Sequence, residues 1–396
     1  MNILVVHRSG INLFRTEGER AFFKEINRSF RGSVKAFFLN AYPHFPELVS
    51  YASFDAIILH ASILGLRYSE REVDLLSLLS PLVNYSGPIV ALPQDEYDCY
   101  LENDRVLAGL GVEFIFTCYP RSVRKLYPSV SGSGATFRSC LAGYVSKKFV
   151  EESRPIEGHH RQVDIVYRGS SLGSEFGELG SVKTYLPGKL KELFDFAGVT
   201  HDIAVGQSKF IKGRDWYAFL RSGRAAIGFQ SGSDLMVANM KEKREKQYVR
   251  FSEGGTISAR HLECAALGVP QILLEGAYGG YLVADTHYIP LKKDLSNIDD
   301  IISDLKCDEK LLKVGRNARR LICSDEIFYL ENHVAEIISV INARLKEKNT
   351  DSGNLGVCWF LRVHISFVSV VNYFNIESVI NFLVIKTKKL CRLFFF

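Results

Sequence analysis

The feature that most constrains this chain is a series of short apolar runs, each the length of a buried strand, separated by longer mixed segments. Five such runs occupy the first part of the sequence, at residues 2–6, 34–39, 56–59, 89–92 and 114–117. Short apolar runs are typical of strands buried on both faces of a parallel sheet, with helices in the segments between them. The pattern predicts a doubly wound α/β domain, and a larger mixed α+β domain is the alternative.

The pattern breaks at residues 151–162, a polar stretch with proline and glycine, and then begins again. New strand-like runs lie at 164–167, 225–229 and 271–274, and helix-like segments lie at 186–197, 215–221 and 259–267. A chain of 396 residues has room for two or three domains. We therefore predict an N-terminal Rossmann-like domain over 1–156 and a C-terminal one over 157–349, which closes with an amphipathic helix at 326–348.

Residues 350–396 have a different character, because a turn-rich linker leads into about 40 mostly apolar and aromatic residues. A membrane-spanning helix needs about 20 apolar residues without charge. Every candidate span here is interrupted by polar residues, among them Arg362, Asn372 and Glu377. We expect a segment lying in the membrane interface, with Lys386 and its neighbouring lysines facing anionic lipid. The alternative is a dispensable extension.

Charge and cysteine spacing exclude several classes of protein. The net charge is +5, and +3 of it lies in the tail, so the body lacks the basic excess expected of a nucleic-acid binder. None of the eight cysteines lies within C-x-x-C spacing of another, which argues against a local zinc site or redox pair. The first residues, MNILVVHRSG, resemble a strand more than a signal peptide. These observations predict a cytoplasmic protein whose tail allows a peripheral position on the cytoplasmic face of the membrane.

Polar residues with catalytic potential follow several of the predicted strands. His60 follows one run, Asp95 and Glu96 follow another, and in the second half Arg168 and Glu275 follow theirs. In doubly wound folds, ligands bind beyond the carboxyl ends of the strands. The positions together favour a cleft between two facing domains, although each residue alone could simply cap the next helix.

The segment 254–290, GGTISARHLECAALGVPQILLEGAYGGYLVADTHYIPL, carries the densest signal. Arg260 lies near the start of a predicted helix, Glu263 lies one turn later, and a loop with three glycines follows the next strand: Gly276, Gly279 and Gly280. A helix N-terminus with an arginine and exposed backbone amides can hold a diphosphate. The carboxylate could accept hydrogen bonds from a ribose diol, and a local i,i+3 ion pair is the alternative.

The run RHLECAALGVPQILLEG followed by YGG resembles the donor-binding segment of glycosyltransferases with the GT-B fold. It is most similar to the group-one, spore-protein (CgeB-like) branch found in surface-polysaccharide gene clusters. Further similar segments are PQDEYDCY at 93–100, EFIFTCYP at 113–120, VDIVYRGSSLGSEFGELGSVK at 163–183 and HYIPLKKDLSNI at 287–298. The resemblance covers about residues 50 to 340 and excludes the tail.

The resemblance implies two Rossmann-like domains facing a cleft, and a sugar transfer from a nucleotide-sugar to a glycan or lipid-linked glycan, as in O-antigen, capsule or lipopolysaccharide biosynthesis. By the same resemblance, Glu263 would bind the donor ribose, the glycine loop would approach the diphosphate, and Glu275 would reach sugar hydroxyls. Arg168 and Lys183 would neutralise the leaving diphosphate. No cofactor is implied beyond the donor itself.

Two features bear on the chemistry. Many retaining members carry a second glutamate eight residues before the ribose-binding one, and here that position is Gly255, so both retaining and inverting outcomes stay open. The chain also lacks the Asp-x-Asp motif with which the other main transferase fold holds a metal. We therefore expect a metal-independent enzyme in which cationic side chains and helix dipoles stabilise the leaving group. For an inverting reaction the candidate bases are Asp95, Glu96 and His60.

Two other functions fit the same two-domain cleft. A nucleotide-sugar epimerase would need carboxylates on both sides of the sugar ring and would form its product without an acceptor. A non-catalytic protein that binds nucleotides or glycans would explain the glycine at position 255. Acceptor-dependent release of nucleoside diphosphate distinguishes a transferase from both.

Overall fold

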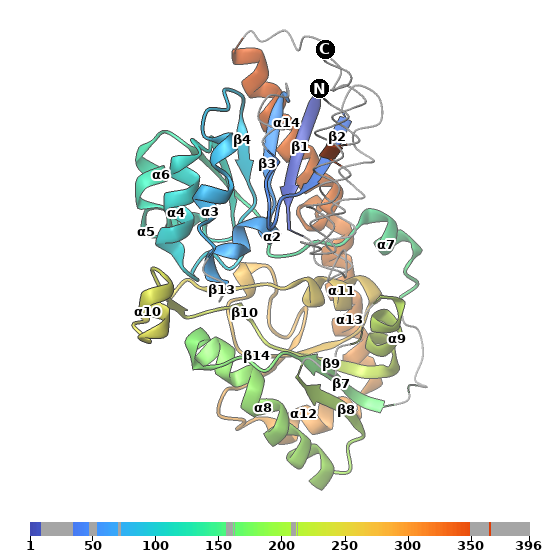
Figure 1. Ribbon diagram of the computed structural model, residues 1–396. Coiled ribbons are helices and arrows are strands. Elements are labelled where there is room, and N and C mark those ends of the chain that lie inside the picture. The colour runs from blue at the N-terminus through green and yellow to red at the C-terminus, as the bar shows by residue number, and fades with distance from the viewer. Residues whose placement is uncertain are drawn as a thin grey trace, which may run out of the picture.

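Two parallel β-sheets, each covered by helices, occupy the upper and lower halves of the computed structural model in Figure 1. The structure describes residues 1–8, 35–46, 54–69, 73–155, 161, 163–206, 211, 213–348 and 364–365. The predicted arrangement of two Rossmann-like α/β domains is confirmed.

The N-terminal sheet has six strands in the order β2-β1-β3-β4-β5-β6, all parallel. Its strands are β1 (Asn2–His7), β2 (Lys35–Asn40), β3 (Ala56–Leu59), β4 (Ile89–Ala91), β5 (Phe114–Thr117) and β6 (Thr136–Ser139). The five predicted runs are all strands, with bounds shifted by at most one residue. Strand β6 is absent from the sequence-based prediction, because this edge strand has the sequence TFRS, exposes most of its side chains and contains no apolar run.

Helices cover both faces of this sheet. One face packs on an apolar cluster with residues from α2 (Ala61–Leu64), the 3-10 helix η2 (Gly65–Tyr68), α3 (Leu75–Leu78) and α4 (Tyr100–Gly109). The other face is covered by α14 (Leu330–Glu347), whose Val334, Ile337 and Ile341 pack against strand residues such as Val5 and Ile58. The predicted closing helix therefore exists, and it returns to the N-terminal sheet, as Figure 1 shows for α14 beside β1.

The C-terminal sheet has five parallel strands in the order β15-β14-β9-β7-β8. The strands are β7 (Val163–Gly169), β8 (His201–Val205), β9 (Gly223–Gly228), β14 (Gln271–Leu274) and β15 (Ile289–Leu291). The helices of this half are α8 (Gly177–Phe196), α9 (Arg214–Ser222), α11 (Ala259–Leu267), α12 (Ile298–Leu305) and α13 (Asp308–Ser324). The cluster on one face includes residues of α8 and α12, and the cluster on the other includes residues of α9 and α11.

Between β9 and α11 the chain leaves the sheet and reaches the N-terminal domain; we call residues 230–256 the interdomain strap. It contains two short antiparallel pairs, β10 (Ser231–Gly232) with β13 (Gly255–Thr256) and β11 (Leu235–Met236) with β12 (Val249–Arg250), and the helix α10 (Met240–Arg244). Two of its side chains, Met236 and Phe251, are buried in the N-terminal core.

Backbone hydrogen bonds and an ion pair fix the strap to the N-terminal domain. The amides of Tyr100 and Leu101 donate to carbonyls of the strap at 3.0 Å each, and the Val237 amide donates back to Tyr97 at 3.0 Å. The Lys243 ammonium lies 2.6 Å from the Asp98 carboxylate. The charged stretch 241–250 therefore takes part in an interdomain contact.

The apolar tail lies outside the described residues, apart from His364 and Ile365. Ile365 is buried in the N-terminal core cluster. Within the part of the chain that the structure describes, no helix is long and apolar enough to cross a membrane.

Candidate active site between the domains

Loops that follow N-terminal strands meet the start of α11 in the C-terminal domain. Gly143, in the segment after β6, approaches so closely that an added Cβ would lie 2.6 Å from the Cβ of Ala259. Gln94, just after β4, donates to the carbonyl of Ala142 in the same segment at 3.4 Å. Because α11 begins at the carboxyl end of the second sheet, the ligand-binding edges of both domains face each other there.

The C-terminal side of this boundary contains an arginine held between aromatic rings. The guanidinium carbon of Arg260 lies 5.2 Å from the ring centre of Tyr167 and 5.5 Å from that of Trp216. The indole Nε1 of Trp216 donates to Glu263 at 2.9 Å. The aromatic contacts orient the guanidinium of Arg260. The hydrogen bond from the indole orients the carboxylate of Glu263, one turn further along α11. Trp216 has no part in the sequence-based prediction, because its contact is with a residue 47 positions away.

Lys183, on α8, is the second cation of this group. Burial, and then repulsion from Arg260, lower its pKa from 10.5 to about 8, and attraction to Asp95 in the other domain offsets part of the effect. No ion pair within the described part of the chain engages its ammonium group. Lys183 therefore interacts electrostatically with two other predicted site residues, Arg260 in its own domain and Asp95 in the other.

The start of α11 is organised by a reciprocal cap. His261 Nδ1 lies 3.0 Å from the Ser258 amide and 3.1 Å from its hydroxyl, while the Ser258 side chain caps the third residue of the helix. Burial, and then the neighbouring Arg260 and Lys183, lower the pKa of His261 to about 3. His261 is therefore neutral at physiological pH and fixes the helix end, where exposed amides and the helix dipole favour an anion.

The predicted glycine loop is exposed beside this helix. Gly279 and Gly280 have φ of 67° and 80°, which side chains rarely adopt, so the loop depends on glycine here. Glu275 and Gly276 are exposed, and the Glu275 amide donates to Leu291 on the neighbouring strand at 2.9 Å. The four residues are therefore open to a ligand at the carboxyl end of β14.

Arg168 lies at the end of β7, as expected, but its guanidinium is already occupied. It makes two hydrogen bonds to the Asp202 carboxylate, at 2.8 and 2.9 Å, and lies 4.4 Å from the ring centre of Phe219. Because successive side chains of a strand point to opposite faces, Arg168 lies on the other face from Tyr167, which contacts Arg260. Its charge is therefore compensated inside its own domain by Asp202.

Asp95 is the candidate base with the most suitable position. Its side chain is exposed, its backbone has a φ of 48°, and one carboxylate oxygen accepts a hydrogen bond from the Tyr97 hydroxyl at 2.9 Å. Among the described residues, no hydrogen bond engages the other carboxylate oxygen.

Glu96 and His60 are poorly placed to reach a substrate. Glu96 is 0% exposed, and its carboxylate accepts hydrogen bonds from the Thr117 and Tyr127 hydroxyls and the Cys118 amide. Burial raises its pKa to about 7 despite these donors. His60 is also buried, caps α2 through Ser62, and has its pKa lowered to about 4 by burial. Both positions suit structural roles at strand ends.

Strand register also brings together two thiols that are 22 residues apart. Pairing of Thr117 with Ser139 places Cys118 beside Cys140, and their sulfur atoms are 3.8 Å apart. Cys140 lines a cavity of about 280 Å³ that also touches Tyr281, just after the glycine loop. Among the described residues, no three or more His, Cys, Asp or Glu side chains are grouped as a metal site.

No protein-family model matches this sequence, and no curated protein matches it. Solved structures do resemble its fold. Anabaena HepE in complex with UDP aligns over 87% of this chain and 100% of its own, with a TM-score of 0.50 and 12% identity. Sucrose-phosphate synthase from Thermosynechococcus elongatus covers 88% of this chain and 100% of its own, with a TM-score of 0.53 and 10% identity. An alpha-glucosyltransferase in complex with UDP-glucose and DNA containing an abasic site covers 86% of this chain and 99% of its own, with a TM-score of 0.51 and 10% identity.

These neighbours are GT-B glycosyltransferases. The fold expected from the donor-segment resemblance is therefore confirmed. At 10 to 12% identity, the likeness extends to the fold alone.

Proposed function

We propose that this protein is a glycosyltransferase that moves a sugar from a nucleotide-sugar donor to a glycan acceptor. The observation that carries the proposal is the electrostatic interaction of two cations and one carboxylate across the domain boundary. Lys183 and Arg260 belong to the C-terminal domain, and Asp95 belongs to the N-terminal one. A GT-B enzyme needs functional groups on both domains, because donor and acceptor approach each other between them.

The donor side suits a nucleoside diphosphate. Lys183 and Arg260 would bind the diphosphate near the N-terminus of α11, where backbone amides and the dipole add to the attraction. The Nε of Arg260 is buried and has no hydrogen-bond partner in the described residues, so a phosphate oxygen would satisfy it. Glu263, oriented by Trp216, would accept hydrogen bonds from the ribose, and the loop at Gly279 would approach the phosphates.

Bond cleavage would place new negative charge on the leaving diphosphate, and the same two cations would stabilise it. The acceptor hydroxyl would attack the anomeric carbon from the N-terminal side. In an inverting reaction its proton would pass to Asp95, the exposed carboxylate opposite Lys183. This scheme requires no metal ion.

Further details of the proposal are more specific. A uridine diphosphate sugar is the first donor to test, because HepE and the alpha-glucosyltransferase were solved with UDP or UDP-glucose. The acceptor we favour is a lipid-linked glycan of bacterial surface polysaccharide synthesis, reached from the cytoplasmic membrane face. Support for the membrane contact comes from the apolar, lysine-containing tail.

The test is acceptor-dependent release of nucleoside diphosphate from a panel of nucleotide sugars, after thermal-shift screening has identified the donor that binds. A transferase releases the diphosphate faster when the acceptor is present. An epimerase would convert the sugar without an acceptor, and a binding protein would be stabilised by the donor without turnover. Asp95→Asn should lower acceptor-dependent release by about 10²–10⁴-fold and keep donor affinity within twofold of wild type.

A further inference from the structure

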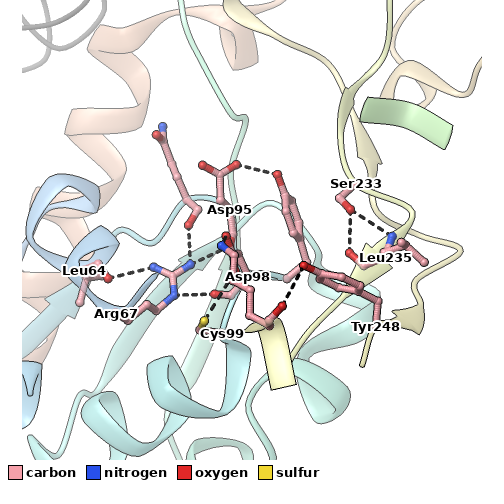
Figure 2. A network of polar contacts seen from close by, with 11 residues as sticks. Leu64, Arg67, Asp95, Asp98, Cys99, Ser233, Leu235 and Tyr248 are labelled. Atoms are coloured by element: carbon pink, nitrogen blue, oxygen red, sulfur yellow. Dashed lines mark hydrogen bonds and ion pairs between the residues drawn. The ribbon is translucent and has the colours of Figure 1, made fainter. Parts of the chain in front are cut away.

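A buried arginine holds the loop that carries Asp95. Arg67, in η2, is 4% exposed, and its guanidinium donates four hydrogen bonds, all to backbone carbonyls. The acceptors are Leu64 at 3.0 Å, Gln94 at 2.9 Å, Asp95 at 2.6 Å and Asp98 at 2.9 Å. Figure 2 shows the guanidinium of Arg67 between Leu64 on one side and the Asp95 and Asp98 segment on the other.

The loop needs such support because its backbone is strained. Asp95 and Cys99 have φ of 48° and 51°, in the left-handed region that residues with a Cβ seldom occupy. Conformations of this kind persist only where the surroundings enforce them. Three of the four carbonyls bound by Arg67 belong to residues 94–98, so one side chain fixes the course of this loop.

The same loop is also fixed from the other domain. Lys243 of the strap pairs with the Asp98 carboxylate at 2.6 Å, and Asp98 forms a parallel backbone bridge with Val237. The Tyr97 hydroxyl donates to Asp95, which sets the direction of the carboxylate. The loop is therefore defined on three sides: by Arg67 beneath it, by the strap, and by its own tyrosine.

We infer that Arg67 is a positioning residue of the proposed transferase, which holds the backbone of Asp95 in place without touching a substrate. This inference rests on the proposed function. Its burial excludes Arg67 from direct contact with donor or acceptor. A planar guanidinium with five donors can join four carbonyls, whereas a lysine ammonium has only three donors on a flexible stem. The geometry of the loop thus depends on the shape of the arginine and not only on its charge.

The experiment compares Arg67→Lys with wild type in the acceptor-dependent assay and in direct donor binding. We expect kcat to fall about 100-fold, the scale of a misplacement of a catalytic group by about 1 Å, with the donor Kd within twofold of wild type. Arg105→Lys is the matched control, because Arg105 is an exposed arginine that pairs with Glu102 and Asp74 outside the loop, and kcat should not change.

A double-mutant cycle with Asp95 separates positioning from general stability. If Arg67 acts through Asp95, Arg67→Lys should cause no further loss of kcat in the Asp95→Asn background. The inference would be overturned if the losses of kcat caused by the two substitutions multiplied in the double variant. A fall in donor affinity equal to the fall in kcat would also overturn it.

Tyr97→Phe provides a second variant if Arg67→Lys does not fold, because it removes only the hydroxyl contact with Asp95. Its loss of kcat should also disappear in the Asp95→Asn background, and persistence of that loss would count against positioning of Asp95 by this loop. A wild-type chain that binds the donor without acceptor-dependent turnover would refute the proposed function itself, and the role of Arg67 with it.

Discussion

Lys183 offers the sharpest test of the site. If its charge serves donor binding, removing the charge should weaken donor binding and at the same time stabilise the fold. Its ammonium group is partly buried beside Arg260, and both burial and repulsion hold its pKa at about 8. Replacing it with methionine keeps the length of the side chain and removes the charge. We therefore expect Lys183→Met to weaken donor binding and to raise the free energy of unfolding. A lysine that served the fold would give a less stable variant.

The magnitude follows from the pKa. A fall from 10.5 to about 8 corresponds to about 3 kcal/mol, because a tenfold change in an equilibrium constant is worth about 1.4 kcal/mol. Solvent screening of a partly exposed group reduces this to about 1.5 kcal/mol of stabilisation at pH 7. Below pH 8 the lysine is charged in both the folded and the unfolded chain, so the full penalty is present. Between pH 8 and 10.5 the folded chain loses the proton first, and the advantage of the variant should fade.

Urea unfolding of the free protein at pH 7 and pH 9.5 measures this difference, and calorimetric titration with the donor measures affinity. Loss of a charge-assisted contact with the diphosphate should weaken donor binding by about 10- to 100-fold at pH 7. Lys189→Met is the matched control, because Lys189 lies exposed on the same helix, and neither quantity should change appreciably. A Lys183→Met protein that is less stable than wild type at pH 7, or a difference independent of pH, would refute the electrostatic account.

Three further predictions follow from the same site and from the tail. Glu263→Gln should keep the fold, because the new amide oxygen can still accept the hydrogen bond from Trp216. It should weaken donor binding by about 1–3 kcal/mol, and unchanged affinity by calorimetry would remove Glu263 from the site. Turnover should survive excess EDTA, because in the proposed scheme Lys183 and Arg260 would stabilise the diphosphate in place of a metal ion. Loss of activity that Mg²⁺ restores would contradict this scheme. Replacing Lys386, Lys388 and Lys389 with glutamine should reduce flotation with anionic vesicles at low salt, because each lysine near such a surface contributes about 1 kcal/mol to membrane binding. Equal flotation of the variant and the wild type would argue against an electrostatic role of the tail.

The parts of the fold that sequence predicts well are those whose local signals agree. Helix α11 begins after Ser258, which caps it, and ends at Gly268, whose φ of 67° suits glycine. The next strand, β14, is an uninterrupted apolar run with all four residues buried. Capping residues, hydrophobic periodicity and apolar runs each involve only a few neighbouring residues, so they can be recognised in the sequence before any tertiary contact is known.

The strap and the edge strand β6 lack such signals. The paired segments of the strap are two residues long, and what holds Met236 and Phe251 in place is the core of the other domain. The sequence around Lys243 looks like a solvated charged stretch because its partner, Asp98, is 145 residues away. Contacts of this kind are decided by tertiary packing, and no local pattern encodes them.

The candidate site likewise contains residues that local sequence indicates and residues whose roles depend on tertiary contacts. The resemblance of the donor segment indicates Arg260, Glu263 and the glycine loop because their spacing lies within one helix and one turn. It also indicates Arg168, yet the alternation of side chains along β7 turns this residue toward Asp202. Arg67 could not be recognised, because its role depends on four carbonyls from two separate segments. Residue type and spacing can identify groups that contact a ligand more readily than groups that position them.

The electrostatics of the free protein argue for an anionic ligand independently of any resemblance. Lys183 and Arg260 repel each other, and the charges of both act on His261 in the first turn of α11, where the helix dipole disfavours positive charge. Asp95 offsets only part of this repulsion. A fold selected for stability alone would place an apolar side chain at position 183, as the Lys183→Met prediction makes explicit. A bound diphosphate would reverse the balance, since its charge would pair with both cations and with the helix end at once. The arrangement is therefore costly in the free chain and favourable in the complex, which is the property expected of a site preorganised for a nucleoside diphosphate leaving group.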